Sequence, residues 1–179
     1  NKCPAGFETM LATLFAESER PAIITEFGQA CCPTDGACES CPATYGGATM
    51  GYDEAILLSP QGYVSECTGE NLFVVRDGEI VTPPSSAGAL EGITQSAVRR
   101  IAEDLGIPYT TGNILRSDLY IADEAFLSGT AAEVVPIRSV DDRVIGAPGP
   151  VTSRIQEIFF QAVRGERPEY SEWNEHVDA

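Results

Sequence analysis

The stretch from Gly62 to Phe73 constrains the fold more than any other part of this sequence. Apolar residues stand on both sides of a short polar segment that contains Gly69, and this pattern predicts two short strands joined by a tight turn. Glu66 lies where the first strand is expected to end, among apolar neighbours. A carboxylate in such surroundings is costly unless another group pairs with it. We therefore expect Glu66 to have a specific partner, either in a functional site or in a structural pair.

Strand and helix signals alternate along the rest of the chain. Asp77-Gly78 between two apolar runs is a strong hairpin signal, and Asp141-Asp142 indicates a second turn of this kind. Gly106 and Gly165 follow helical patterns at the position where glycine ends a helix. These patterns predict a mixed α/β domain. Strands are expected at 22–25, 55–58, 72–75, 79–82, 125–128 and 134–137, and helices at 7–18, 93–105 and 150–164.

Five motifs in a fixed order make residues 51 to about 173 resemble a known family. They are Gly51-Tyr-Asp-Glu-Ala-Ile, the stretch described above, Leu90-Glu-Gly-Ile-Thr, Ser117-Asp-Leu-Tyr-Ile-Ala-Asp-Glu and Gly129-Thr-Ala-Ala-Glu. This part resembles the C-terminal half of branched-chain amino acid aminotransferases, which are pyridoxal-phosphate enzymes of the class IV fold. The resemblance implies an α/β (mixed α+β) domain with a curved mixed sheet and outer helices, and a homo-oligomer.

The resemblance also implies a pyridoxal phosphate site. Glu66 matches the residue that faces the pyridine nitrogen, where a carboxylate keeps the ring protonated. Leu90 matches the residue that packs on the cofactor ring. Ile93 and Thr94 match phosphate-binding positions at a helix start, where unpaired backbone N–H groups and the helix dipole favour an anion. A plain helix start remains the alternative for these two residues.

A second anion-binding loop is expected at Gly129-Thr-Ala-Ala. Thr130 matches a phosphate ligand of the family. Ala131 and Ala132 match the positions that receive the substrate carboxylate, because small side chains leave backbone N–H groups within reach. An ordinary tight turn is the alternative. Two departures from the family stand nearby, since Cys67 replaces a usual glycine and Gln95 a usual arginine.

The catalytic residue stays unassigned. The family needs a lysine that forms a Schiff base with the cofactor, and that lysine lies shortly before the Gly-Tyr-x-Glu segment. Lys2 is the only lysine in this chain, far upstream of Gly51. We therefore interpret Lys2 as a surface residue and expect an incomplete enzyme with weak or absent activity.

Residues 1–50 do not match the family, and we interpret them as an atypical cysteine-rich segment, a possible fusion or chimera, before a 51–179 aminotransferase domain. The strand before Glu26 faintly resembles the nucleophile strand of barrel cellulases, although such chemistry requires two carboxylates. A solvent-facing Glu26 is the alternative. Five cysteines in this segment allow disulfides, free thiols or a zinc site; they are Cys3, Cys31, Cys32, Cys38 and Cys41.

Composition narrows the classes of partner. The 179 residues are 43% hydrophobic and 21% charged, which is typical of a globular protein. Eleven basic and 27 acidic residues give a net charge of −16, and this charge would repel a nucleic acid. No apolar run approaches the roughly 20 residues of a membrane helix, and no signal peptide is evident. We expect a cytoplasmic protein without nucleic-acid or membrane partners, and a functional site without a metal.

The sequence thus predicts amino group transfer between branched-chain amino acids and 2-oxoglutarate, with an amino acid and a 2-oxo acid as partners. Alternatives are a related class IV enzyme, either an aminodeoxychorismate lyase or a D-amino acid aminotransferase, a cellulase fragment that rests on Glu26, and a non-catalytic interaction module. Within the resemblance, the segment Glu70-Asn71-Leu72 together with Gly129-Thr-Ala-Ala favours the branched-chain enzyme.

Overall fold

The strand β4 (Asn71–Arg76) is buried on both faces along nearly its whole length, and the fold is built around it. Successive side chains of a strand point to opposite faces. Leu72 and Val74 therefore enter one hydrophobic core, while Phe73 and Val75 enter another. The computed structural model describes residues 22–27, 52–146 and 148–175, and the statements below concern those residues.

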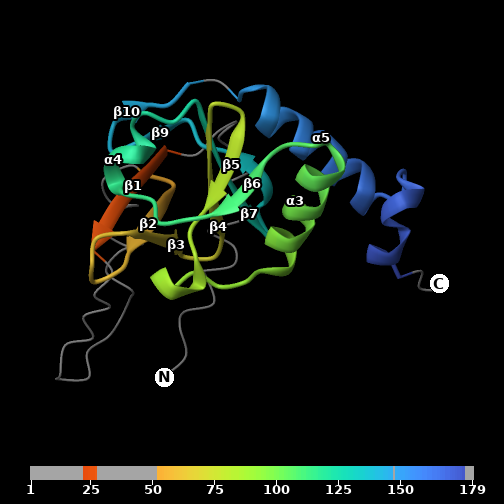
Figure 1. Cartoon of the computed structure of the whole chain (residues 1–179), viewed down its shortest axis with the longest axis horizontal. Coiled ribbons are helices and arrows are strands. Elements are labelled where there is room, and N and C mark those ends of the chain that lie inside the picture. Colours follow the sequence, from red (N-terminus) through yellow and green to blue (C-terminus); the bar gives the residue numbers. More distant parts are fainter. Residues whose placement is uncertain (1–21, 28–51, 147, 176–179) are drawn as a thin grey trace.

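The strands form two five-stranded mixed sheets (Figure 1). The first sheet has the order β10-β9-β1-β2-β3 and the second the order β6-β5-β4-β7-β8. The first contains β1 (Ala22–Phe27), β2 (Glu54–Leu58), β3 (Val64–Cys67), β9 (Ser139–Val140) and β10 (Arg143–Val144). The second contains β4, β5 (Glu79–Thr82), β6 (Tyr109–Thr111), β7 (Glu124–Gly129) and β8 (Glu133–Pro136).

The helices lie outside the sheets. They are α3 (Ile93–Asp104), α4 (Arg116–Leu119) and α5 (Pro150–Val163), with 3-10 helices η1 (Ser85–Ala87) and η2 (Pro168–Trp173). In Figure 1, α3 and α5 lie together at one side of the second sheet, and α4 lies beside β9 and β10. The predicted fold class, a mixed α/β domain with outer helices, is confirmed. The strands are divided between two sheets, because both faces of β4 are apolar and each packs into a core of its own.

The two strands predicted around Glu66 exist, but they join different sheets. β3 pairs antiparallel with β2 in the first sheet, whereas β4 pairs with β5 and β7 in the second. The turn between them is closed by the Cys67 N–H, which donates to the Glu70 carbonyl at 2.8 Å. This turn therefore connects the two sheets.

A strand from the first fifty residues lies inside the first sheet. β1 pairs parallel with β2 on one side and with β9 on the other. The predicted strand at 22–25 is confirmed and extends to Phe27, so Glu26 lies within it, opposite Leu57. The expected helix at 7–18 and the five clustered cysteines lie outside the described residues. The division at residues 50 and 51 stays a prediction.

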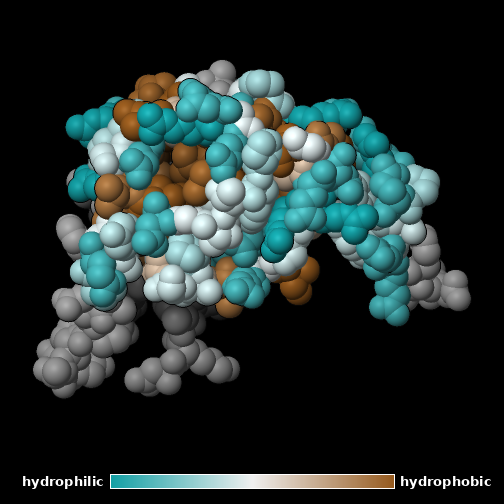
Figure 2. Space-filling model, viewed as in Figure 1, coloured by the Kyte–Doolittle hydropathy of each residue, from teal (hydrophilic) through white to brown (hydrophobic). Residues whose placement is uncertain are grey.

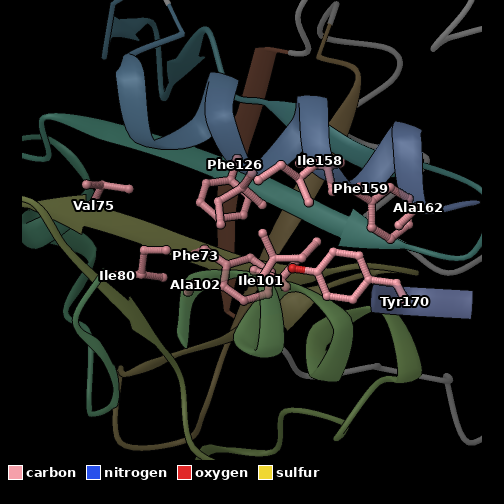
Figure 3. Packing of buried hydrophobic residues seen from close by; sticks show 13 residues of the cluster. Phe73, Val75, Ile80, Ile101, Ala102, Phe126, Ile158, Phe159, Ala162 and Tyr170 are labelled. Carbon is pink, nitrogen blue, oxygen red and sulfur yellow. The ribbon is translucent and has the colours of Figure 1, made fainter. Parts of the chain in front are cut away.

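The hydrophobic core between the second sheet and its helices is the larger of the two (Figure 3). Phe73 of β4 and Phe126 of β7 are fully buried and stack with ring centroids 4.7 Å apart. Ile101 of α3 and Ile158 of α5 point toward these rings. Removal of a buried aromatic ring typically costs about 3–5 kcal/mol, so this stack anchors both helices to the sheet.

Polar and apolar surfaces are unevenly distributed in Figure 2. Hydrophilic residues cover the outer sides of α3 and α5, while hydrophobic residues gather near α4 and β10. Ile121 and Val144 in this second region are 55% and 75% exposed. None of the described helices is long and apolar enough to cross a membrane.

Candidate functional site

A cleft of about 310 Å³ is lined by three segments of the chain: the β3–β4 turn, the start of α3 and the end of β7. Small-molecule sites usually occupy about 300–1,000 Å³, so the cleft is at the lower end of that range. Its lining combines carboxylates, hydroxyls and exposed backbone. The lining residues are Glu66, Cys67, Thr68, Gly69, Glu70, Asn71, Leu90, Glu91, Gly92, Ile93, Thr94, Ser128, Gly129 and Thr130.

Glu66 is held at one side of the cleft by two donors. Its Oε2 accepts hydrogen bonds from the Leu90 N–H at 2.8 Å and from Asn71 Nδ2 at 3.4 Å. Among the described residues, the hydrogen bonds to Glu66 all use Oε2, which leaves Oε1 for a further donor. The expectation that Glu66 has specific partners is therefore met by Leu90 and Asn71.

Asn71 connects Glu66 to the start of α3. Its Nδ2 donates to the Leu90 carbonyl at 2.7 Å, and only 5% of the residue is exposed. A Cβ atom at Gly92 would lie 2.3 Å from Asn71 Oδ1. Glycine is therefore required at Gly92, because the buried amide occupies the space of a side chain there.

The N-terminus of α3 opens into the cleft. Gly92 is its N-cap, no side chain caps this end, and its first turn contains no acidic residue. The first backbone N–H groups of a helix have no partner within the helix and carry the positive end of its dipole. This end can therefore hold an anion, with the Thr94 hydroxyl beside it.

Thr130 and Ser128 line the same cleft as the α3 N-terminus. Thr130 is exposed, whereas Ser128 is fully buried and its hydroxyl lacks a hydrogen-bond partner among the described residues. A Cβ atom at Gly129 would lie 2.9 Å from the Gly69 carbonyl oxygen. The β7 end therefore packs directly on the β3–β4 turn.

The β3–β4 turn also contains a buried carboxyl group, that of Glu70, and bonds a second one, that of Glu54 on β2. These two residues are 5% and 3% exposed. Burial, the charge of Glu54 and a hydrogen bond with Glu54 raise the pKa of Glu70 to about 8. Burial, with the nearby glutamates, also raises the pKa of the Cys67 thiol. Cys67 is the last residue of β3, has no positive φ and packs into the core between the sheets. The pairing of β2 with β3 shifts register between Ile56, the partner of Cys67, and Leu58.

Five of the seven predicted site residues line this one cleft: Glu66, Leu90, Ile93, Thr94 and Thr130. Ala131 and Ala132 follow Thr130 in the turn before β8 and are not part of its lining. Asn71, Ser128 and the Glu54–Glu70 pair were not predicted as site residues. Polar residues at the start of a buried strand, as at Glu70 just before β4 and Asn71 at its first position, were the available signal.

The arrangement suits a ligand with three chemically distinct parts. An anionic end fits the α3 N-terminus with Thr94 and Thr130. A protonated ring nitrogen fits Glu66 Oε1. An apolar ring fits the part of the lining that Leu90 and Ile93 form, since these side chains are 69% and 88% exposed.

Known proteins show the same fold and sequence pattern. The family described as amino-transferase class IV matches residues 47–140. A probable branched-chain-amino-acid aminotransferase of Aquifex aeolicus is 48% identical over 126 residues, which is 69% of this chain and 40% of that protein. The branched-chain-amino-acid aminotransferase of Escherichia coli K12 is 48% identical over 130 residues, which is 72% of this chain and 42% of that protein.

Solved structures agree with these relatives. A branched-chain amino acid aminotransferase of T.th., complexed with N-(5'-phosphopyridoxyl)-L-glutamate, superposes with a TM-score of 0.80 at 41% identity, over 89% of this chain and 56% of that one. An Escherichia coli branched-chain amino acid aminotransferase superposes with a TM-score of 0.79 at 38% identity, over 88% and 56%. This chain therefore spans about two fifths of its curated relatives and just over half of the solved chains.

Proposed function

Because this chain belongs to the class IV aminotransferase family, we propose that its cleft binds pyridoxal phosphate and serves amino group transfer from branched-chain amino acids to 2-oxoglutarate. The observation that carries the proposal is that Glu66 and an uncapped helix N-terminus line one cleft. The Ser128 hydroxyl, which has no hydrogen-bond partner in the described part of the chain, and the exposed apolar pair Leu90 and Ile93 also fit this cofactor.

Each residue has a separate task in the proposal. When bound, the cofactor supplies the electron sink that amino group transfer requires. Glu66 Oε1 holds a proton on the ring nitrogen by direct charge attraction. The α3 N-terminus, Thr94 and Thr130 hold the phosphate through N–H and O–H donors. Leu90 and Ile93 cover the ring.

The substrate side of the site is less complete within the described residues. The backbone N–H groups of Ala131 and Ala132 are proposed to receive the substrate carboxylate, since Ala131 is exposed next to Thr130. The amine that joins the cofactor is unassigned, because the chain's single lysine, Lys2, lies outside the described residues. The homo-oligomer implied by the family resemblance remains part of this proposal.

A spectroscopic titration tests the proposal. Pyridoxal phosphate should change its absorbance on binding, and Thr130→Ala should weaken binding by about 1 kcal/mol or more, which is the scale of a lost charge-assisted hydrogen bond. Thr110→Ala is the matched control, because Thr110 is also exposed but bonds Glu79 on β5, away from the cleft. Equal affinities of both variants, or no affinity in the wild-type protein, would refute the assignment.

Both relatives and both solved structures described above are branched-chain enzymes. They do not favour the aminodeoxychorismate lyase, the D-amino acid aminotransferase, the cellulase fragment or the interaction module. A substrate comparison between L-leucine and a D-amino acid with the cofactor-loaded protein separates the nearest of these alternatives.

A further inference from the structure

The cleft rests on two acidic side chains that have no basic partner among the described residues. Glu54 and Glu70 are both more than nine-tenths buried, and none of the ion pairs in the described part of the chain includes either of them. Two buried carboxylates side by side cannot both be charged without a large cost. A proton shared between them is the simplest way to remove that cost.

The hydrogen-bond geometry of Glu54 supports a shared proton. Oε1 of Glu54 accepts from the Ala55 N–H and from the Thr68 hydroxyl, each at 2.7 Å. Oε2 is buried and receives no hydrogen bond from another described group. Glu54 and Glu70 bond to the adjacent residues Thr68 and Gly69, so both carboxyl groups lie at the same turn, and their interaction contributes to the raised pKa of Glu70. A carboxylic acid at Glu70 would provide the missing donor.

The pair also supports both walls of the anion-binding part of the cleft. Glu54 holds Thr68, and Glu70 Oε2 accepts from the Gly69 N–H at 3.3 Å, so the pair braces the β3–β4 turn. On the opposite wall, a Cβ atom at Gly129 would lie 3.1 Å from Glu70 Cγ. Thr130, the residue after Gly129, is therefore placed by the contact between Gly129 and Glu70.

We infer that Glu70 is a positioning residue whose protonated carboxyl group donates a hydrogen bond to Glu54 Oε2, and that this acid–acid hydrogen bond holds the Thr130 loop against the phosphate-binding helix end. Loss of the proton would place two like charges together under the turn and a new negative charge near the bound phosphate. Either effect weakens phosphate binding. The inference rests on the proposed function, because the ligand is the cofactor phosphate of the same cleft.

The surroundings of the pair are acidic or neutral. The titratable group of β3 that faces the pair is Cys67, whose thiol interacts with both Glu54 and Glu70. Glu66, the preceding residue of β3, bonds Leu90 and Asn71 instead. β7 contributes the uncharged Ser128 and Gly129 at this point. No described cation faces the pair, so nothing balances the second negative charge when a rise in pH removes the shared proton. This loss of the proton is expected around pH 8.

Affinity for pyridoxamine 5'-phosphate at about pH 7 and about pH 9.5, on either side of the Glu70 pKa, tests the inference. We expect the dissociation constant of the wild-type protein to rise between these values by about tenfold more than that of Glu70→Gln, as for a like charge near the ligand at an intermediate dielectric constant. The amide introduced by Glu70→Gln can still donate to Glu54 but carries no proton that titrates. Titration of the ligand itself is common to both proteins and cancels in this comparison.

Glu91→Gln is the matched control, because Glu91 lines the same cleft but is exposed. This variant should keep the pH dependence of the wild-type protein. The same ratio of dissociation constants in the wild-type protein and in Glu70→Gln would overturn the inference.

A second measurement does not depend on ligand binding. Infrared difference spectra of the ligand-free wild-type protein should show a protonated carboxyl band that disappears around pH 8 and is missing in Glu70→Gln. Absence of that band at neutral pH would also overturn the inference. If the wild-type protein fails to bind the phosphate ligand while the band is present, the proposed function fails and the shared proton stands.

Discussion

The backbone N–H of Leu90 lies 2.8 Å from Oε2 of Glu66 and donates a hydrogen bond to it. The residue expected to cover the cofactor ring is therefore joined directly to the residue expected to face the ring nitrogen. Asn71 closes the arrangement by donating to both, at 2.7 Å to the Leu90 carbonyl and at 3.4 Å to Glu66. The orientation of Glu66 thus depends on a loop that is distant in sequence.

Asn71→Ala should lower both stability and cofactor affinity. The change leaves the Leu90 carbonyl without its donor, which typically costs about 1–3 kcal/mol of unfolding free energy, and it releases Glu66. Asn174→Ala is a matched control, because Asn174 Nδ2 donates to the Ala162 carbonyl at 2.8 Å, away from the cleft. Urea denaturation should show losses in both variants, and pyridoxal phosphate titration a loss in Asn71→Ala alone. Unchanged affinity in Asn71→Ala would show that Glu66 does not need this support.

Gly149→Ala should destabilise the protein through the start of α5. Glu124 of β7 accepts hydrogen bonds from the Val151 and Thr152 N–H groups at 3.1 and 2.7 Å, and a Cβ atom at Gly149 would lie 2.1 Å from the Glu124 carboxyl group. Overpacking of this kind typically costs about 1–3 kcal/mol. Gly112→Ala is the control, since its Cβ atom would make only an ordinary 3.7 Å contact. Equal denaturation midpoints for the two variants would contradict the expectation.

The unfolding free energy should fall as pH rises from about 4.5 toward 8. The pKa of Glu70 is raised in the folded state to about 8 from an ordinary value of 4.5. Between these values the folded chain binds more protons than the unfolded chain, so stability declines by up to about 1.4 kcal/mol per pH unit from this group. The contribution is fully present below the ordinary value and is lost as pH passes through the folded one.

Glu70→Gln should flatten this slope in denaturation experiments repeated across the pH range. Glu103→Gln should leave it intact, because the Glu103 side chain is 53% exposed and pairs with Arg99 at the surface. A slope that is identical in Glu70→Gln and the wild-type protein would assign the pH dependence to other groups.

Lys2 should carry no specific cofactor adduct. Borohydride reduction makes the bond between an aldehyde and an amine permanent. Lys2 is the only lysine, so in peptide mass analysis the label can be found only on the Lys2 side chain or on the terminal amine of Asn1. We expect Lys2→Ala to bind pyridoxal phosphate as the wild-type protein does. Stoichiometric labelling of Lys2 together with measurable transamination would show instead that the N-terminal segment delivers the amine to the Glu66 site.

Local sequence signals identified most of the elements that position the site. Asp77-Gly78 forms the predicted hairpin turn, with φ of 51° and 78°. Gly106 follows the end of α3 and has a φ of 67°, as expected for a glycine that ends a helix. These predictions succeeded because turns and helix ends depend on the conformational preferences of a few adjacent residues.

What the sequence by itself determined is the order of strands and helices, the fold class and, through its motifs, five residues of the cleft. Only the tertiary structure assigned β3 and β4 to different sheets, because that choice depends on which faces of β4 find apolar partners elsewhere in the chain. The same holds for Asn71 with Leu90 and for Glu54 with Glu70. Each pair is far apart in sequence, and its energy comes from burial that exists only after the two sheets and α3 have packed together.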